Sequence, residues 1–468
     1  MSNDNKKTMG KDFTQGKILP LLIGFFLPFL LANILTSLYN TIDTAIIGNT
    51  VGSTGTIAVS NGGKLLNLYT NISIAIAGGG QILISQLIGA KRRDQLNRTI
   101  GTLFSLMLIV SIVLMTVTLI LSEYIVVWLN IDEAAQAQAL AYLRITSCGL
   151  PLVFGYNAVS SVLRGLGDGK SPLLFIAIAT VVNFAGDYFF ILVLHMEADG
   201  TAWATIIGQG ISLIFSLILL FIKRKEFGFD FKPKSFLIQK DKLAIISKIG
   251  FPTALRSCCI SITQLVLMSY VNPFGLVPAA AYNIGDKIVH LTNVFDNTTK
   301  NAAGSMIAQN IGANKYDRAK KIVNWGFFIT LSTTAILIIL GLLIPNQIFS
   351  IFTNDSEVLA LAPTFMRIAC VIFLLSGIMS PLDAVVTGTG NAKLSLIAGI
   401  LDGVVLRIGF SLLFVNVFNM GVPGFFLADA LARLGPIIIG GIYYYGGFWK
   451  KYKKLVKDNP PSIEEKIG

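Results

Sequence analysis

Residues 223–248 read KRKEFGFDFKPKSFLIQKDKLAIISK, a basic and polar stretch that separates two long, almost entirely apolar halves. Motifs recur across this stretch at a constant offset. The pattern QxxGA at 86–90 returns at 309–313, and GxG at 165–167 returns at 388–390, each 223 positions later. The chain is therefore predicted to contain an internal duplication, whose period is too long for a solenoid.

The composition indicates a membrane protein. Of the 468 residues, 53% are hydrophobic and only 13% are charged, and the mean hydropathy is +0.70. A soluble chain of this length would have too little polar surface to cover itself. The four cysteines lie in apolar runs and there are only two histidines, so we expect neither a disulfide framework nor a metal site, and no cofactor.

Twelve apolar runs approach or exceed the roughly 20 residues that cross a bilayer as a helix. Six precede the basic stretch and six follow it. The expected spans are 18–47, 56–86, 99–121, 138–164, 171–194, 201–222, 243–271, 279–309, 322–344, 359–387, 394–418 and 423–446. The expected organisation is a tail (1–17), a first bundle (18–222), a linker (223–242), a second bundle (243–446) and a tail (447–468).

Because each half has an even number of spans, both halves run in the same direction. The predicted fold is an all-α membrane protein of twelve transmembrane helices, in two parallel six-helix repeats related by a pseudo-two-fold axis along the membrane normal. Such folds transport by rocking one bundle against the other around a central site. The architecture therefore favours a transporter over an enzyme or a channel.

Positive charge is confined to one side of this topology. Of the 37 Lys and Arg residues, 29 lie in the termini or at alternate connections, with Arg164 and Lys248 counted at the adjoining helix ends, and the opposite connections hold none. The positive-inside rule then predicts that both termini and the linker are cytoplasmic, in the cell membrane. The net charge of +12 follows from this topology, so we expect contact with membrane lipids and no nucleic-acid partner.

Three polar residues of the first half are predicted to lie at a similar depth in the outer leaflet: Asp43, Asp187 and Thr205. Asn183 shares a helix face with Asp187, four residues away. Carboxylates at this depth cost roughly 2.5–3.5 kcal/mol each, so they normally face a cavity or a partner. Two partly desolvated acids suit a proton relay, and the same oxygens suit Na⁺ equally. The alternative is a structural salt bridge, for instance with Lys64.

The second half carries charges of its own, among them Arg256, Asp286 and Asp383. We expect six of them to form a network: Asp296, Lys300, Asp402, Arg407, Asp429 and Arg433. Two pairs within this set are spaced i,i+4, which favours a self-neutralised structural role. The alternative is a polar patch on the substrate path, suited to zwitterionic or anionic ligands.

Taken together, the duplication, the QxxGA turns, Pro28 and Asp43 resemble the multidrug and toxic compound extrusion (MATE) transporters over nearly the whole chain. Asn183, Asp187 and Thr205 are similar to positions of the DinF-like branch. The resemblance implies a cation-coupled antiporter that expels amphipathic, often cationic compounds. It also implies that these residues couple the cation and that Pro28 is a conformational kink.

Three further residues are expected to line a substrate cavity in the first half: Tyr39, Asn40 and Asn157. We expect a monomer whose partners are small amphipathic molecules and whose coupling ion is H⁺ or Na⁺. A lipid-linked saccharide or phospholipid flippase of the same wider superfamily is the alternative, since it would suit the basic residues of the second half.

Overall fold

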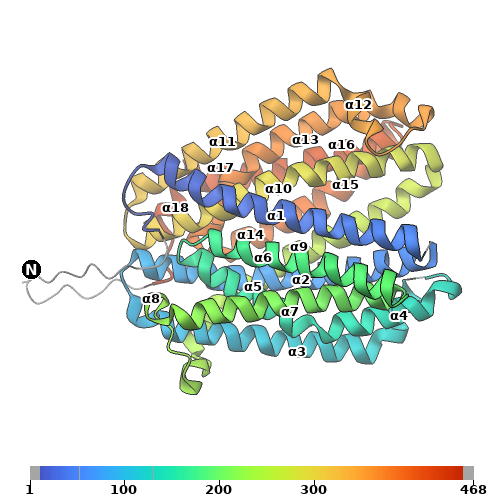
Figure 1. Cartoon of the computed structure of the whole chain (residues 1–468). Coiled ribbons are helices and arrows are strands. Elements are labelled where there is room, and N and C mark those ends of the chain that lie inside the picture. The colour runs from blue at the N-terminus through green and yellow to red at the C-terminus, as the bar shows by residue number, and fades with distance from the viewer. Residues whose placement is uncertain (1–10, 52, 130, 457–468) are drawn as a thin grey trace, which may run out of the picture.

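The computed structural model describes residues 11–51, 53–129 and 131–456, with the backbone alone for 38–49, 53, 54 and 56. The described residues form helices and turns, with no strand among them (Figure 1). The helices of the first half are α1 (Ile18–Thr50), α2 (Ser53–Gly89), α3 (Leu96–Trp128), α4 (Glu133–Cys148), α5 (Leu150–Gly165), α6 (Lys170–Asp187), the π-helix η2 (Tyr188–Val193) and α7 (Ala198–Ile222).

The second half repeats this order with more interruptions. Its helices are α9 (Lys240–Val271), α10 (Leu276–Gly312), α11 (Tyr316–Leu343), α12 (Pro345–Ser350), α13 (Ser356–Thr389), α14 (Ala392–Ile400), the π-helix η5 (Leu401–Leu406), α15 (Arg407–Leu412), the π-helix η6 (Leu413–Val417), α16 (Val422–Ala432) and α17 (Leu434–Tyr445). Short helical turns make the remaining connections: η1 (Arg93–Gln95), α8 (Arg224–Phe227), η3 (Pro233–Phe236), η4 (Asn272–Phe274) and α18 (Phe448–Lys451).

The twelve predicted spans are confirmed. Ten helical segments of the described chain are long and apolar enough to cross a membrane, and α4 with α5 makes an eleventh. The twelfth is α10, whose 37 residues are long enough to cross but carry Asp286, Lys287, Asp296 and Lys300 within the span. Several helices extend beyond the apolar runs. One of them is α9, which starts at Lys240, inside the expected linker.

The fourth span is bent where the sequence predicts one continuous helix. The axes of α4 and α5 differ by 45°. Pro151 follows the break at Gly149, and a proline cannot donate the backbone hydrogen bond that would continue the helix. Gly149 also packs directly against the Ile206 side chain of α7, so the bend places α5 beside α7.

The two halves meet most closely near the end of the bundle where the described chain begins and ends. A Cβ atom at Gly89 would collide with the carbonyl oxygen of Gln309, and one at Gly312 with that of Gln86. These are the glycines and glutamines of the repeated QxxGA motif, so α2 and α10 cross through small residues in a pseudosymmetric contact. The Gln81 amide also donates to Ser305 Oγ at 2.6 Å.

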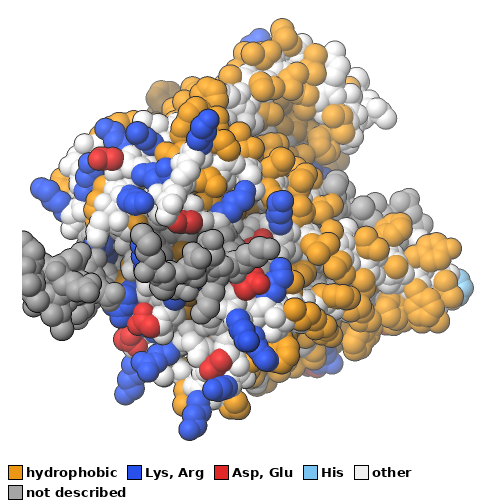
Figure 2. Space-filling model, turned by 60° about the vertical axis from the view of Figure 1, so that its left-hand side comes forward, with side chains coloured by type: hydrophobic (Ala, Val, Ile, Leu, Met, Phe, Trp, Pro, Cys, Tyr) orange, Lys and Arg blue, Asp and Glu red, His pale blue; other side chains and the backbone are white. Residues whose placement is uncertain are grey.

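Both terminal segments cross between the halves at this same end. The Phe13 backbone N–H donates to Gln309 Oε1 at 2.5 Å, and the Phe13 ring is buried. The Leu455 backbone N–H donates to Gln86 Oε1 at 3.0 Å, and that amide donates in turn to the Gly388 carbonyl at 3.0 Å. Away from this end the two lobes separate, as Figure 2 shows.

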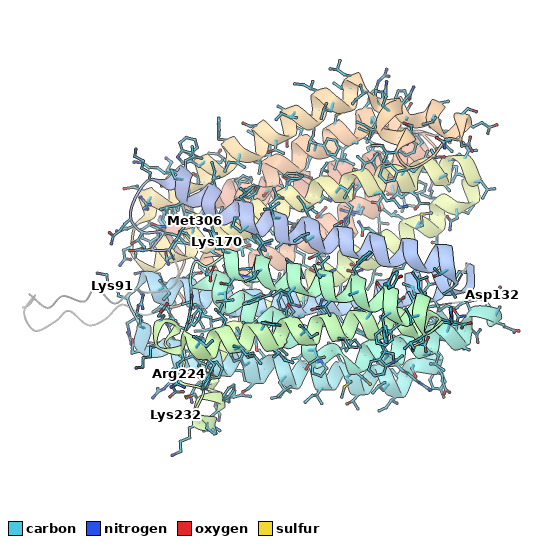
Figure 3. All side chains as sticks on the ribbon, in the orientation of Figure 1. Lys91, Asp132, Lys170, Arg224, Lys232 and Met306 are labelled. Atoms are coloured by element: carbon cyan, nitrogen blue, oxygen red, sulfur yellow. The ribbon has the colours of Figure 1, made fainter. Side chains whose placement is uncertain are left out.

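The basic linker packs on the first half. Phe227 and Phe229 are buried, 0% and 1% exposed, and Ser105 Oγ donates to the Phe236 carbonyl at 2.5 Å. Most basic side chains of the linker stay on the surface, whereas Lys242 at its end is buried and binds Gln95. Figure 3 shows Lys91, Lys170, Arg224 and Lys232 at the end where the chain begins, and Asp132 at the opposite end. This separation of charge is the asymmetry that the sequence predicts for a polytopic membrane protein.

Candidate functional site

The polar cluster of the first half lies between α6 and α7. Asn183 and Asp187, one turn apart on α6, are 1% and 0% exposed, and Thr205 on α7 is 4% exposed. Gly208 of α7 faces Asn183, and Gly186 of α6 faces Ala204. These contacts between small residues bring the two helices close together and bracket Thr205, so the amide, the carboxylate and the hydroxyl occupy one buried layer.

Asp187 lies at a change of helix type. It is the last residue of α6, and the following residues, Tyr188–Val193, form the π-helix η2. A short π-helix inside an α-helix often marks a functional site, because it shifts side chains around the axis and loosens the backbone ladder. The same change occurs near the corresponding point of the second half, in η6.

The structure describes only the backbone of the α1 residues that the sequence predicts to join this cluster. The α1 backbone packs against α6, but the side chains of Tyr39, Asn40 and Asp43 are outside the described part, so their roles stay predictions. The helix continues through Pro28 without a break. Asn157 is buried on α5, 7% exposed, where α5 packs against α2 and α7.

The alternative for this cluster, a salt bridge with Lys64, stays a prediction for Asp43, whose side chain lies outside the described part. Lys64 of α2 is exposed, and no ion pair joins it to Asp187 in the described chain. Asp187 thus carries a fully buried carboxylate in a layer that also holds an amide and a hydroxyl. Such oxygen-rich surroundings can bind a proton or a hard cation.

The charge network of the second half centres on Asp429. Its two carboxylate oxygens bind two different arginines: Arg407 at 2.7 Å and Arg433 at 2.8 Å. Arg433 Nε also donates to Ser376 Oγ at 2.8 Å. All three charged residues are less than a tenth exposed. The predicted i,i+4 pair of Asp429 and Arg433 is therefore present, within a larger set of contacts.

Asp402 joins the network through a π-helix. It pairs with Arg407, five residues later, at 3.3 Å. In an α-helix, residues five apart point in different directions, whereas the i→i+5 hydrogen bonds of a π-helix stack them on one face. Residues 401–406 form η5, so the change of helix type is what brings these two side chains together.

One expected pair does not form. Asp296 and Lys300 of α10 are spaced i,i+4, but no ion pair joins them in the described chain. Lys300 interacts electrostatically with both Arg256 and Asp383 of neighbouring helices, in addition to Asp296. Spacing brings the Cβ atoms of such residues within about 5–6 Å, but it does not by itself bring the charged ends of the two side chains together.

A second buried pair connects α9 with α13. Arg256 Nη2 lies 2.9 Å from Asp383 Oδ2. The two residues are far apart in the sequence, so no local pattern predicts their contact, and Ser376 was missed for the same reason. Asp286 of α10 is exposed and interacts electrostatically with Asp429, Arg407 and Arg433. The network therefore extends to a side chain that the described fold leaves exposed.

Known proteins share this architecture. The chain is 27% identical over 438 residues to the probable multidrug resistance protein YoeA of Bacillus subtilis, covering 91% of this chain and 93% of that protein. It is 27% identical over 442 residues to the probable multidrug resistance protein YpnP of the same organism, covering 94% and 98%.

The fold agrees with these similarities. A solved structure described as the outward-facing conformation of a multidrug resistance MATE family transporter of the MOP superfamily superposes with a TM-score of 0.87 at 21% identity, covering 97% of this chain and all of that one. The MatE family model matches twice, at residues 28–189 and 252–413, once in each repeat. The chain therefore belongs to the MatE family of membrane transporters.

Proposed function

We propose that this protein is a secondary active transporter, not an enzyme, that exchanges H⁺ or Na⁺ for amphipathic, cationic drugs or toxins. The proposal draws on the relatives named as probable multidrug resistance proteins and on two bundles that contact at one end and separate at the other. This shape suits alternating access, in which the bundles rock around a central site.

The observation that carries the proposal is the buried layer of Asn183, Asp187 and Thr205. A carboxylate in a membrane bundle is costly unless a proton or a cation neutralises it. Binding of the coupling ion would change the charge of this layer and thus favour one packing of α6 against its neighbours. Asp43 and Pro28 of α1, which packs on α6, are proposed to complete the site and to supply the bend. We propose that Asn183, Asp187 and Thr205 place the chain in the DinF-like branch.

The charges of the second half favour efflux over the flippase alternative. A flippase for a phosphate-linked lipid would need cationic groups that are free to bind the phosphate. Arg256, Arg407 and Arg433 each contact a carboxylate instead. Their positive charge is therefore largely compensated within the fold. We propose that this network is structural and that the substrate cavity lies in the first half.

The proposed location is the cell membrane, with both termini in the cytoplasm. The support is the gathering of Lys and Arg at one end of the bundle together with the positive-inside rule. In this orientation the contact between the halves lies on the cytoplasmic side, and the space between the lobes faces outward.

The test is dye efflux from proteoliposomes with an imposed pH or Na⁺ gradient. Asp187→Asn and Asp43→Asn should fold and bind ethidium at equilibrium, yet lose gradient-driven efflux, because an amide cannot carry the charge that the ion neutralises. Pro28→Ala should lose efflux with both acids present. Glu133→Gln is the matched control, since this exposed acid of the first half lies outside the cluster.

Efflux by both Asn variants at the rate of the unmodified protein, under either gradient, would place the coupling site elsewhere. Loss of ethidium binding together with efflux would instead indicate a structural role for the cluster. Comparing the two gradients for the unmodified protein identifies the coupling ion.

A further inference from the structure

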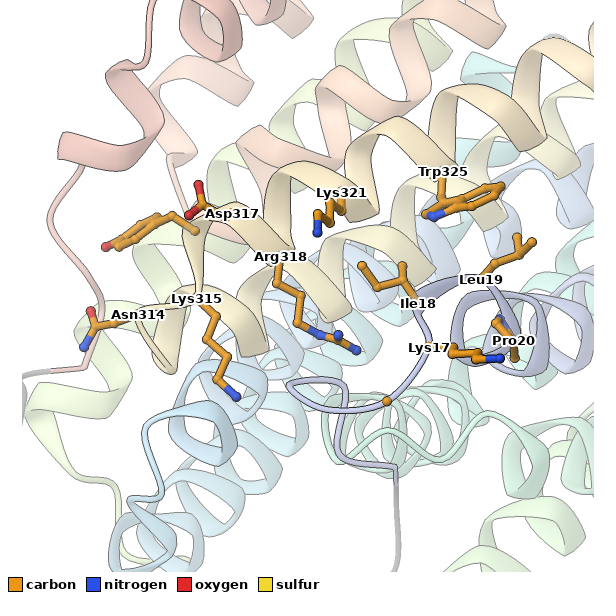
Figure 4. A pocket seen from close by; sticks show the side chains of 12 residues that line it. Lys17, Ile18, Leu19, Pro20, Asn314, Lys315, Asp317, Arg318, Lys321 and Trp325 are labelled. Carbon is orange, nitrogen blue, oxygen red and sulfur yellow. The ribbon is translucent and has the colours of Figure 1, made fainter.

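A cavity of about 840 Å³ opens between the start of α1 and the start of α11 (Figure 4). Four basic residues line it: Lys17, Lys315, Arg318 and Lys321. Asp317 and the indole of Trp325 are also part of its wall. The cavity lies on the outside of the bundle, far along the chain from the polar cluster of α6 and α7, and the proposed transport cycle makes no use of it.

The positive charge of this cavity is not compensated by ion pairs. None of its four basic side chains pairs with a carboxylate in the described chain. Two of them bind backbone carbonyls of the segment that precedes α1. Arg318 donates to the Phe13 and Gln15 oxygens at 2.9 and 2.6 Å, and Lys315 donates to the Thr14 oxygen at 2.9 Å. These contacts hold the cations in place without neutralising them.

The cavity lies at the boundary of the membrane-crossing region. The spans of α1 and α11 begin at Ile18 and Tyr316, on the wall of the cavity. Exposed apolar side chains continue from it along both helices. Ile23, one turn beyond Leu19, is 45% exposed, and Phe328, one turn beyond Trp325, is 59% exposed. A basic pocket that continues into apolar surface matches a ligand with a negative head and hydrocarbon tails.

We propose that this cavity binds the head group of an anionic glycerophospholipid from the leaflet at this end of the bundle. The phosphate lies among Lys17, Arg318 and Lys321, and the acyl chains follow the apolar side chains of α1 and α11. Because Phe13 and Gln15 belong to the segment that contacts both halves, the bound lipid also joins the start of the chain to the second half. The occupant is a lipid rather than a free phosphate, since a free anion would use only the basic part of the cavity.

The full-length protein in nanodiscs provides the test, through quenching of Trp325 by brominated lipids. The fluorescence of Trp325 is obtained as the difference in tryptophan fluorescence between the unmodified protein and the Trp325→Phe variant. Dibromo-phosphatidylglycerol should quench it more strongly than dibromo-phosphatidylcholine at the same fraction of the bilayer. Lys17→Gln with Lys321→Gln should lower this preference on the order of tenfold, since each basic residue near the surface contributes attraction for anionic lipid. Among the described residues, the bonds that hold the preceding segment come from Lys315 and Arg318 and not from these two lysines, so the fold should be retained.

Two further variants distinguish binding at this cavity from a general attraction between anionic lipid and a positively charged protein. Lys17→Arg with Lys321→Arg should keep the preference. Lys225→Gln with Lys232→Gln, which removes two exposed charges of the linker at the same end, should also keep it. Equal quenching by both lipids would overturn the proposal, as would an equal loss in the linker variant. Relief of quenching by inorganic phosphate at low concentration would assign the cavity to a free anion instead. The readout is binding, so it does not depend on the transported substrate.

Discussion

Asp429 shows how single residues of the second half depend on one another. Its carboxylate binds Arg407 and Arg433, and Arg407 also binds Asp402. A buried ion pair contributes little net stability, because its attraction mainly offsets the cost of removing both charges from water. Removing one partner is different, since the other charge is then left buried and uncompensated. Single substitutions in this network should therefore lower the stability of the fold strongly, whereas substitution of both partners of a pair should lower it less.

We expect Asp429→Asn to lower the free energy of unfolding by about 3–5 kcal/mol, because two buried arginines lose their shared carboxylate. Asp429→Asn with Arg433→Gln should recover part of this loss, and chemical denaturation in detergent measures both. Glu123→Gln is the matched control. Its ion pair with Arg144 has side chains 73% and 47% exposed, so its loss should change stability by less than about 1 kcal/mol. A paired variant that folds well but cannot transport would favour a substrate role for this network.

At the scale of helices, the contact between the halves depends on α2 and α10. The described hydrogen bonds between the halves gather near Gln86 and Gln309, with Asn33 to Thr298 at 2.9 Å further along the bundle. The glycines of the repeated motif allow backbone to approach backbone. Such a contact between rigid helices can open and close as a unit, because a packed interface has discrete arrangements.

A link between α2 and α10 should stop transport. Gln81 and Ser305 face each other with a side-chain hydrogen bond of 2.6 Å, so Gln81→Cys with Ser305→Cys in a cysteine-free protein should react with a short bifunctional thiosulfonate. The linked protein should lose dye efflux, and a reductant should restore it. The control pair is Asn97→Cys with Ser235→Cys, whose side chains lie 3.1 Å apart but do not join the halves. Full efflux by the linked α2–α10 protein would show that this contact need not open.

At the scale of the whole molecule, charge orients the protein in the membrane. Lys91, Lys170, Arg224 and Lys232 lie at the end where the chain begins, and Asp132 lies at the other end (Figure 3). Moving Lys or Arg across a bilayer during insertion is costly, so this distribution selects one orientation. In the orientation proposed above, the contact between the halves faces the cytoplasm.

Cysteine labelling in intact cells tests this orientation. Lys232→Cys and Glu357→Cys, both at exposed positions, should react from opposite sides in a cysteine-free protein. An impermeant maleimide should label position 357 directly and position 232 only after the membrane is made permeable. Labelling of both positions from outside would contradict the predicted orientation.

The sequence alone was sufficient to predict the duplication, the twelve spans and the all-helical class. It also identified Asn183, Asp187 and Thr205 as candidates, and these prove to share one buried layer. These features could be predicted because they depend on local properties. Hydropathy over one span, charge in one loop and the spacing of residues along one helix can all be read along the chain.

Apart from the predicted pair of Asp429 and Arg433, only the tertiary structure decided which charged groups meet. Arg256 contacts Asp383 on a distant helix, and Asp402 reaches Arg407 because residues 401–406 form a π-helix. Asp296 and Lys300 have the right spacing and still do not pair. The spacing of residues along a helix specifies only the helix face from which a side chain starts. A long charged side chain can reach several partners, and in the absence of water it turns toward the oppositely charged group that a neighbouring helix provides.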